Sequence, residues 1–322
     1  MTGLYSLLLG IFTFVQLNCE NLFDCEHDSL KQDTEYSADG LRHWNRGRYW
    51  QKLTNISKEI LACSSKNDRG LEVVPDLVAL CEIENDSVAH YLTKRSLLRN
   101  AGYEFVITSS PDVRGIDVAL LYSPSSFRLI TTHSIGIRPP EGMRPTRDIL
   151  YVAGEVASGD TLHVFVVHAP SRFSGKRATE PYRMLVARRL QQSIDSIRAI
   201  STDPKIIVSG DFNDESHDKA PQFLAGNGLT DISVGIKGAH GAKGSYKYQG
   251  QWQTIDHIFV SRPVKERLIE CVVNDMTFLL EQDSKFGGVK PLRTFWGYRY
   301  QGGYSDHLPL VARFRTGSSG DD

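Results

Sequence analysis

The sequence lacks the patterns that mark several common classes of protein. It has no GxGxxG and no GxxxxGK[ST] segment, which argues against the familiar glycine-rich nucleotide loops. Its five cysteines form no CxxC pair and show no zinc-site spacing, and their odd number makes a disulfide framework unlikely to account for the fold, although a single bridge stays open. No internal repeat and no linker-like segment divides the chain, so one large domain is the simplest organisation.

A net charge of one sign is also missing. The chain of 322 residues carries 37 Lys and Arg against 38 Asp and Glu, so no global field draws it to nucleic acid or to an anionic membrane. Any polyanion must bind through local patches, and two segments combine basic with aromatic residues: Arg42 to Lys52, with Trp44, Tyr49 and Trp50, and residues 285–304. The hydrophobic share of 40% is ordinary for a globular protein with a sizeable core.

Long apolar runs are scarce, and the main one lies at the N-terminus, from Leu4 to Val15. It is too short and interrupted for a membrane-spanning helix. No Lys or Arg precedes it and no small-x-small cleavage site follows it, while residues 11–17 alternate as a strand does. We therefore expect an N-terminal extension over residues 1–10, no membrane span and a cytoplasmic protein. Export is the alternative, if residues 1–15 act as a signal segment.

The remaining apolar patterns predict more strands than helices. Helices are expected over residues 47–63, 86–100, 180–199 and 219–226. In the third helix Thr179 is the expected cap and Pro181 suits the first turn. Strands are expected over residues 76–83, 103–108, 117–122, 127–132, 150–157, 162–167, 206–208, 254–260 and 308–314. This pattern favours one α/β domain with two sheets.

Candidate functional groups follow the strands, beginning with the segment KIIVSGDFND at residues 205–214. Its apolar run predicts a buried strand that ends in a Ser-Gly turn. Asp211 and Asn213 would then point to the same side at the mouth of that strand. A carboxylate beside an amide suits holding a water molecule against a phosphate or a carbonyl. An Asx turn that caps the strand is the alternative interpretation.

Two further strand ends carry ionisable groups. Glu82 ends the apolar strand over residues 76–83, where an unpaired buried carboxylate costs several kcal/mol and requires a cation, a donor or solvent. His168 ends the run LHVFVV, where it is either a catalytic group or a satisfied structural one. A metal ligand at Glu82 competes in the same way with a solvated strand end.

The order of the motifs is more specific than any of them alone. LNCENLF, LCEIEN, VVHAPSR, GDFND, TIDHIFVS and YSDHLPL follow one another over residues 11–315. Together they resemble the endonuclease/exonuclease/phosphatase superfamily, which includes the DNase I-like nucleases. The resemblance implies an α/β fold of the α+β type, a four-layer sandwich of two mainly antiparallel sheets flanked by helices. The domain would span residues 11–315, before a disordered tail at 316–322.

The resemblance also implies roles for individual residues. The metal site would comprise Asn18, Glu82 and Asp306, holding Mg²⁺, with Mn²⁺ or Ca²⁺ as alternatives. The expected catalytic residues are His168, which faces the phosphate; Asp211 and Asn213, which orient water and phosphate; Asp256, which holds His307; and Asp117, which orients His168. The candidate phosphate contacts are Arg114, Arg147 and Arg172.

The substrate is less defined than the chemistry, because one such site serves many phosphate esters. A nuclease-like phosphodiesterase acting as a monomer, with nucleic acid as a candidate partner, is our first expectation. A phosphatase for a small or lipid-derived phosphate ester is the first alternative, and a non-catalytic binding module that kept the fold is the second. Whether His307 or Asp211 takes the proton from water stays open at the level of the sequence.

Overall fold

The computed structural model describes residues 10–66, 70–141 and 143–316. The predicted N-terminal extension, apart from Gly10, and the predicted tail, apart from Thr316, lie outside the described residues. Among the described residues, none of the helices has the length and apolarity needed to span a membrane.

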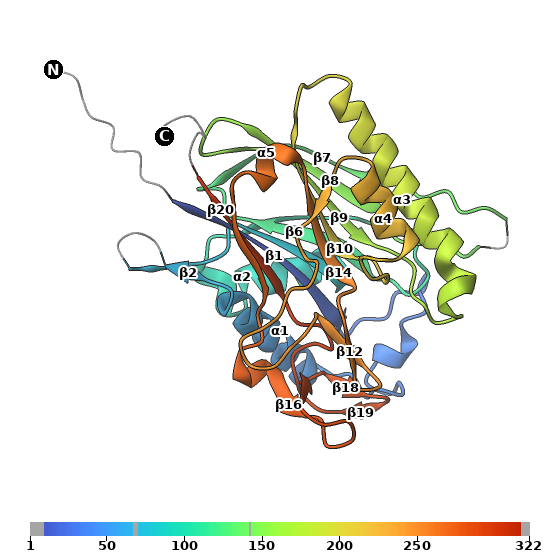
Figure 1. The fold of residues 1–322 in the computed structure, drawn as a ribbon. Coiled ribbons are helices and arrows are strands. Elements are labelled where there is room, and N and C mark those ends of the chain that lie inside the picture. The colour runs from blue at the N-terminus through green and yellow to red at the C-terminus, as the bar shows by residue number, and fades with distance from the viewer. Residues whose placement is uncertain (1–9, 67–69, 142, 317–322) are drawn as a thin grey trace.

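Two six-stranded sheets form the centre of the molecule (Figure 1). The first sheet contains, in spatial order, β15 (Leu268–Val273), β20 (Leu310–Arg315), β1 (Ile11–Leu22), β4 (Leu77–Ile83), β6 (Asp117–Tyr122) and β5 (Glu104–Ile107). The second contains β11 (Thr230–Asp231), β14 (Asp256–Val260), β10 (Lys205–Asp211), β9 (Thr161–His168), β8 (Ile149–Val156) and β7 (Phe127–Ile135). In each sheet one central pair is parallel and every other pairing is antiparallel. The predicted fold class is confirmed.

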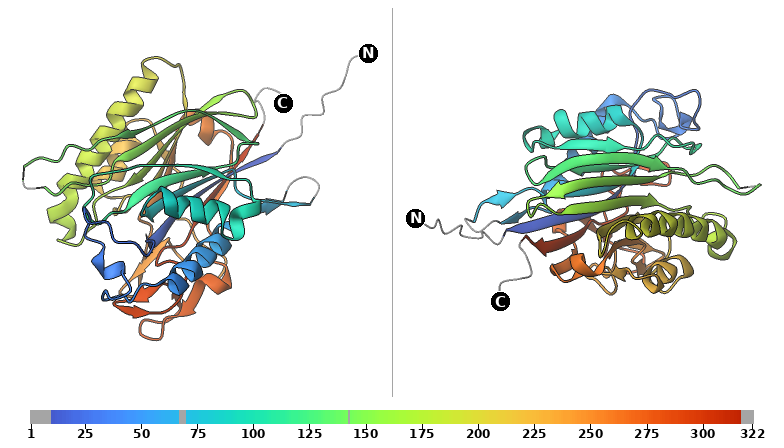
Figure 2. Two further views of the ribbon diagram at one scale, coloured as in Figure 1. Left: turned by 180° about the vertical axis from the view of Figure 1, so that it is seen from behind. Right: turned by 90° about the horizontal axis from the view of Figure 1, so that it is seen from above.

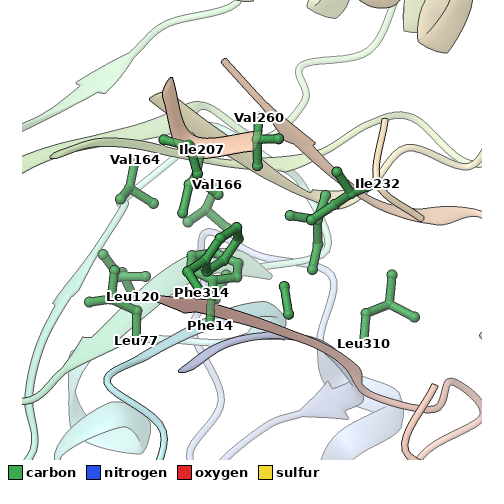
Figure 3. Packing of buried hydrophobic residues seen from close by; sticks show 14 of the residues in the cluster. Phe14, Leu77, Leu120, Val164, Val166, Ile207, Ile232, Val260, Leu310 and Phe314 are labelled. Atoms are coloured by element: carbon green, nitrogen blue, oxygen red, sulfur yellow. The ribbon is translucent and has the colours of Figure 1, made fainter. Parts of the chain in front are cut away.

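The two sheets pack face to face through apolar side chains. Figure 3 shows this layer, in which Phe14 of β1 and Phe314 of β20 lie opposite Val164 of β9, Ile207 of β10 and Val260 of β14. These side chains are almost fully buried, and each full burial of such a side chain contributes roughly 1.5–3 kcal/mol. Alternation along each strand sends the neighbouring residues to the opposite, outer face, where helices cover them.

Helices cover both outer faces of the sandwich. The first sheet is covered by α1 (Arg46–Leu61) and α2 (Asp86–Lys94), and the second by α3 (Lys176–Arg198) and α4 (Lys219–Gly226). Figure 2 shows α2 and α3 on opposite sides of the strands. The remaining short helices are α5 (Arg262–Lys265) and the 3-10 turns Thr34–Tyr36, Leu97–Asn100 and Thr277–Leu279. The layer order is helix, sheet, sheet, helix.

Several short hairpins lie outside the two sheets. They pair β2 (Ser65–Lys66) with β3 (Glu72–Val73), β12 (Tyr246–Tyr248) with β13 (Gln251–Gln253), β16 (Leu280–Gln282) with β17 (Val289–Pro291), and β18 (Phe295–Trp296) with β19 (Arg299–Tyr300). The last three hairpins occupy segments in which the sequence pattern predicted no strand. Strands of two or three residues are too short to show periodicity, so the pattern could not reveal them.

The start of α3 corrects three expectations. The helix begins at Lys176 rather than near residue 180, so Thr179 lies inside it and Pro181 is its sixth residue. Arg183, a charged residue of the same helix, is buried. Its guanidinium donates to Thr179 Oγ1 at 2.6 Å and to the Lys176 carbonyl at 2.7 Å, and its Nε lies 2.7 Å from Asp214 Oδ1. These contacts stabilise the extra turn.

Three members of the first basic and aromatic patch lie in the core. Trp44, Tyr49 and Lys52 are buried, and the Lys52 ammonium donates to Thr294 Oγ1 at 2.5 Å. Most of the other residues of the segment, among them Arg46 and Trp50, are exposed. The second patch differs, because Trp296 and Tyr298 are more than half exposed. The expectation of a polyanion surface over residues 42–52 is therefore wrong for its buried members.

Candidate active site

The central parallel pairs of the two sheets end at the same place. In the first sheet Asn18 lies near the end of β1 and Glu82 near the end of β4, and in the second His168 and Asp211 end β9 and β10. The two sheets are joined directly there, because Asn18 Nδ2 donates to Asp211 Oδ2 at 3.1 Å. Parallel strands present their carboxyl ends at one edge, which is where ligands bind in many α/β folds.

Glu82 is turned toward this edge by a bulge in β4. The register of β4 against β6 shifts between Cys81 and Ile83, and Glu82 adopts a φ of 62°. A non-glycine residue in this region is uncommon and is retained where surrounding structure enforces it. Glu82 Oε2 accepts the Asn21 amide at 2.9 Å, whereas Oε1 lies 3.7 Å from His168 Nε2 and 3.9 Å from Arg114 Nη1. The bulge therefore places Oε1 inside the site, where no donor among the described residues bonds to it.

His168 lies between the carboxylates of the two sheets. Its Nε2 is 3.7 Å from Glu82 Oε1 and 3.7 Å from Asp211 Oδ2. Burial lowers the pKa of His168 well below its usual value, and the positive charges of Arg147, Arg114 and His307 lower it further. The imidazole is therefore neutral at pH 7. Its Nδ1 is buried and has no hydrogen-bond partner in the described part of the chain.

Asp211 is buried, and its carboxylate accepts two hydrogen bonds. Its Oδ1 accepts the Asn213 amide at 2.8 Å, and its Oδ2 accepts Asn18 Nδ2. Burial raises the pKa of Asp211 to about 7, and the nearby charge of Asp256 adds to the increase, whereas His307 opposes it. A carboxyl group with such a pKa can take up or release a proton near neutrality.

His307 and Asp256 form a buried pair that also bridges the sheets. His307 Nδ1 lies 2.6 Å from Asp256 Oδ2, and the same carboxylate accepts Ser245 Oγ at 2.6 Å and Gln16 Nε2 at 3.5 Å. Burial acts to lower the pKa of His307, but Asp256, Asp306 and Asp211 together raise it well above its usual value. The structure thus brings the expected pair together, with the imidazole in its charged form.

A second acidic group adjoins this pair. Asp306 Oδ1 lies 4.0 Å from His307 Nε2, and Asp306 Oδ2 accepts Arg293 Nη2 at 2.8 Å. Arg293 Nε also lies 3.4 Å from Glu20 Oε1, and Glu20 accepts the Thr294 amide at 2.6 Å. Glu20 and Arg293 are site neighbours that the sequence did not reveal. Glu20 stood within the motif LNCENLF and Arg293 within the basic and aromatic segment 285–304, but neither was assigned to the site.

The remaining predicted residues differ in their distance from the centre. Asn213, with a φ of 52°, donates through Nδ2 to the Ala169 carbonyl at 3.1 Å. Arg147 is buried and donates to the same carbonyl at 2.9 Å and to Asp112 Oδ2 at 3.0 Å, so two of its nitrogens are already engaged. Arg114 donates to Asn21 Oδ1 and keeps 43% of its side chain exposed. Of the three arginines, Arg114 is thus the nearest accessible one to Glu82.

Two predicted residues are engaged elsewhere. Asp117 accepts hydrogen bonds from the Thr108 hydroxyl and the Ser110 amide, and no bond joins it to His168 among the residues described. Arg172 donates to Gln253 Oε1 at 3.0 Å. Asp117 thus holds the loop that precedes β6, and Arg172 lies against the β12–β13 hairpin.

The donor set fits a hard divalent cation. Ligand atoms of Asp211, Asp256 and His307 lie within 4.8 Å of one another. His307, however, is protonated by its contact with Asp256, and an imidazolium cannot bind a metal. Glu82 Oε1 accepts no hydrogen bond from the described residues, and Asp211 across the site has its pKa raised by burial and negative charge. Buried negative charge with oxygen donors suits Mg²⁺, which takes one or two carboxylates and keeps several waters.

Solved structures with the same architecture include an endonuclease/exonuclease/phosphatase family protein from Bacteroides thetaiotaomicron. It is 15% identical, with a TM-score of 0.62 and coverage of 96% of this chain and 98% of that one. A mannosyl-6-phosphatase from the same organism is 16% identical, with a TM-score of 0.60 and coverage of 94% and 98%. The human Nocturnin catalytic domain with bound sulfate is 20% identical, with a TM-score of 0.55 and coverage of 95% of each chain.

The comparison with curated protein sequences gave no match to this chain. A family model nevertheless matches residues 13–316, almost the whole of the described chain. That span includes every candidate residue at the convergent strand ends. The chain therefore belongs to the Endonuclease/Exonuclease/phosphatase family.

Proposed function

We propose that this protein is a divalent-cation-dependent, nuclease-like phosphodiesterase. The observation that carries the proposal is the convergence of Glu82, His168, Asp211 and the Asp256–His307 pair from both sheets at one edge. Hydrolysis of phosphate esters requires stabilised charge on the phosphoryl oxygens, an aligned water and a route for protons. Each requirement has a matching group in this set.

Glu82 would hold the cation through Oε1, with Asn18 and Asp306 acting through bound waters. A bound divalent cation neutralises charge on the phosphoryl oxygens. The Asn18 side chain links Asp211 to the Glu20 backbone amide, since Asn18 Oδ1 accepts that amide at 3.0 Å. The relative positions of Glu20 in β1 and Asp211 in β10 are thereby fixed before any ligand binds.

Asp211 is the better candidate for the group that takes the proton from water. His307 is kept protonated by Asp256, and an imidazolium has no lone pair with which to accept a proton. The charged His307 instead donates to the phosphate, while neutral His168 can donate one hydrogen bond to it. The Asn213 amide group, held by the Ala169 carbonyl, orients the Asp211 side of the site.

The surroundings of the site favour a substrate that extends beyond one phosphate. Trp296 is 57% exposed, and its ring lies 4.5 Å from Lys290 Nζ and 5.8 Å from the Arg293 guanidinium. Arg293 connects this ring to Asp306 within the site. Exposed aromatic rings beside cations suit a nucleic-acid chain, through base stacking and phosphate contacts.

The proposal is tested by hydrolysis of bis-p-nitrophenyl phosphate with Mg²⁺ or Mn²⁺, with a chelator as control. We expect metal-dependent turnover that Asp211→Ala lowers by ~10²- to 10⁴-fold. Cleavage of an oligonucleotide without release of inorganic phosphate supports a phosphodiesterase. Release of inorganic phosphate from small or lipid-derived phosphate esters, without diester cleavage, supports a phosphatase instead. A folded protein that turns over neither class would be a binding module.

A further inference from the structure

A basic cavity adjoins the candidate active site on the side of the second sheet. Its volume is about 550 Å³, within the range of pockets that bind small molecules. Its walls come from the approach to β6, the segment before β8 and the segment that leads into α3. The lining residues used below are Arg114, Arg144, Thr146, Arg147, Phe173 and Tyr182.

The cavity is continuous with the candidate site through two of its arginines. Arg114 lies 3.9 Å from Glu82 Oε1, and Arg147 donates to the Ala169 carbonyl that also accepts Asn213 Nδ2. A group in the cavity is therefore separated from the reacting phosphate by single side chains. This spacing suits the next unit of a substrate whose scissile bond lies at Glu82 and Asp211.

Two of the residues that line the cavity have polar atoms that lack a partner among the described residues. Thr146 Oγ1 and Arg147 Nε are buried and have no hydrogen-bond partner in the described part of the chain. Buried polar groups are nearly always paired, so two orphans in one wall point to a ligand or bound water there. Asp112, the acidic residue in the lining, is already paired with Arg147 Nη1 at 3.0 Å. Arg144 is exposed and forms no ion pair among the described residues, so the cavity attracts an anion.

The rim of the cavity adds a flat apolar surface. Phe173 is 98% exposed and has no ring contact among the described residues, and Tyr182 lies nearby in the lining. A single exposed phenylalanine is ordinary, but this one lines the same cavity as the accessible guanidinium groups of Arg114 and Arg144. Phosphate next to a planar ring is the chemistry of a nucleotide, and stacking of one base on an aromatic side chain stabilises binding appreciably.

We propose that this cavity binds the nucleotide adjacent to the scissile phosphate in a single-stranded nucleic acid. Arg144, Thr146 and Arg147 would bind its phosphate, and Phe173 would stack on its base. A single strand is required because the bases of a duplex are stacked on one another and paired. The inference rests on the proposed phosphodiesterase activity and names its substrate class.

The experiment compares a short substrate with a longer one. Arg144→Ala, Phe173→Ala and the double variant are assayed on bis-p-nitrophenyl phosphate, which has neither a second phosphate nor a nucleobase, and on oligo-dT and oligo-U of six nucleotides. Arg95→Ala is the matched control, because Arg95 is an exposed arginine just after α2, over the first sheet. Fluorescence anisotropy of a 5′-labelled oligo-dT with Ca²⁺ measures binding separately from turnover.

We expect each single variant to lower kcat/KM for the oligonucleotides by roughly tenfold, mainly through KM, as loss of one stacked base or one phosphate contact would. Turnover of bis-p-nitrophenyl phosphate should change by less than about twofold, and Arg95→Ala should match the wild type on all substrates. A preference for oligo-dT or oligo-U would identify the source of the strand.

Several outcomes would overturn the inference. Unchanged oligonucleotide KM and anisotropy in the double variant would remove the cavity from the binding surface. An equal loss on both substrates would show that these residues act on the catalytic centre. Tighter binding of duplex than of single strand would exclude base stacking here. If the wild type hydrolyses neither substrate, the proposed activity fails, whereas the anisotropy of wild type and double variant still decides whether the cavity binds a single strand.

Discussion

The ends of the two central parallel pairs share a topology but differ in chemistry. Asn18 and Glu82, at the ends of β1 and β4, present oxygen and amide groups in a strained backbone, where Glu82 has a φ of 62°. His168 and Asp211 lie at the ends of β9 and β10. The pKa of His168 is lowered and that of Asp211 is raised, so both shifts favour the uncharged form. Under the proposed function, the first sheet would supply the cation site and the second the groups that handle protons.

The comparison teaches that cross-sheet contacts, rather than either sheet, create the site. Asn18 reaches Asp211 at 3.1 Å, and His307, just before β20, reaches Asp256 at the start of β14. Ser209 Oγ donates to Gln16 Oε1 at 3.2 Å behind them. A polar seam therefore continues the apolar sandwich of Figure 3 up to its functional edge. Packing of the two sheets and assembly of the site are consequently one event.

The largest effect is expected on the proton-handling side. Asp211→Ala and His307→Ala should each lower kcat by ~10²- to 10⁴-fold, because each removes a group that transfers or donates a proton in the transition state. Steady-state assays on bis-p-nitrophenyl phosphate measure this. The exposed substitution Asp39→Ala is the control. Wild-type turnover in both folded site variants would refute the role assignment.

The next largest effect distinguishes Glu82, at the end of β4, from His168, at the end of β9, by their metal affinity. Glu82→Gln should weaken the affinity for Mg²⁺ by about 100-fold, since loss of even a residue that only supports a metal ligand costs 10- to 100-fold. His168→Ala should lower turnover and leave the metal titration close to that of the wild type. Isothermal titration with Mg²⁺ and Mn²⁺ distinguishes them. Equal metal affinities in the two variants would end the division into a cation side and a proton side.

The strand ends were largely predictable from sequence, whereas their partners were not. Asp211, Glu82 and His168 were recognisable because apolar runs end at each of them, and such runs are strands with a buried interior. Glu20 and Arg293 were missed because their contact joins residues 273 positions apart and depends on a positive φ at Glu20. Sequence periodicity carries no information about such pairings.

The same reasoning explains the errors in the helices and patches. Arginine is usually solvated, yet Arg183 is buried, where Asp214 in a distant loop neutralises it. Lys52, Trp44 and Tyr49 were expected on a basic and aromatic surface, but all three are buried, two of them in α1 and Trp44 just before it. β15 was missed because its residues are only partly buried at a sheet edge, where the apolar alternation is weak.

The two sheets also differ in how buried ionisable groups are paired. The second sheet holds a buried ion pair between His257 and Asp231. His257 Nδ1 lies 2.9 Å from Asp231 Oδ2. Burial acts to lower the pKa of His257, but Asp231 outweighs it and raises the pKa above 6.5; the pKa of Asp231 is lowered in return. The contribution of His257 to stability is therefore fully present below about pH 6.5 and is lost as the pH rises through its raised folded pKa.

His257→Gln tests this sign. The substitution should destabilise the protein by about 2 kcal/mol at pH 6, the range for a hydrogen bond to a charged group. The difference in Tm between wild type and variant should narrow steadily toward pH 9. Exposed His90→Gln serves as the control, with no effect at either pH. A difference that does not vary with pH would mean that His257 is neutral in the folded state.

The helix layer over the first sheet holds the opposite case, a buried acid without a partner. Both carboxylate oxygens of Glu59 in α1 are buried and have no hydrogen-bond partner among the described residues. Burial raises the pKa of Glu59 to about 8, with Lys52 opposing and Glu20 adding to the shift. Because the unfolded chain releases this proton near pH 4.5 and the folded one near pH 8, Glu59 lowers stability as the pH rises between those values.

Glu59→Gln should therefore be the mildest of these changes and the only one that stabilises. The neutral amide removes the ionisation difference, so we expect a gain of about 1 kcal/mol at pH 8, or ~2 °C in Tm, and little change at pH 5. Thermal unfolding at the two pH values measures it, and Glu72→Gln, at an exposed position in β3, is the control. A loss of stability at pH 8 would show that the Glu59 carboxylate is charged and paired inside the helix layer. The contrast between an unpaired buried acid in α1 and the paired His257–Asp231 in the second sheet would then disappear.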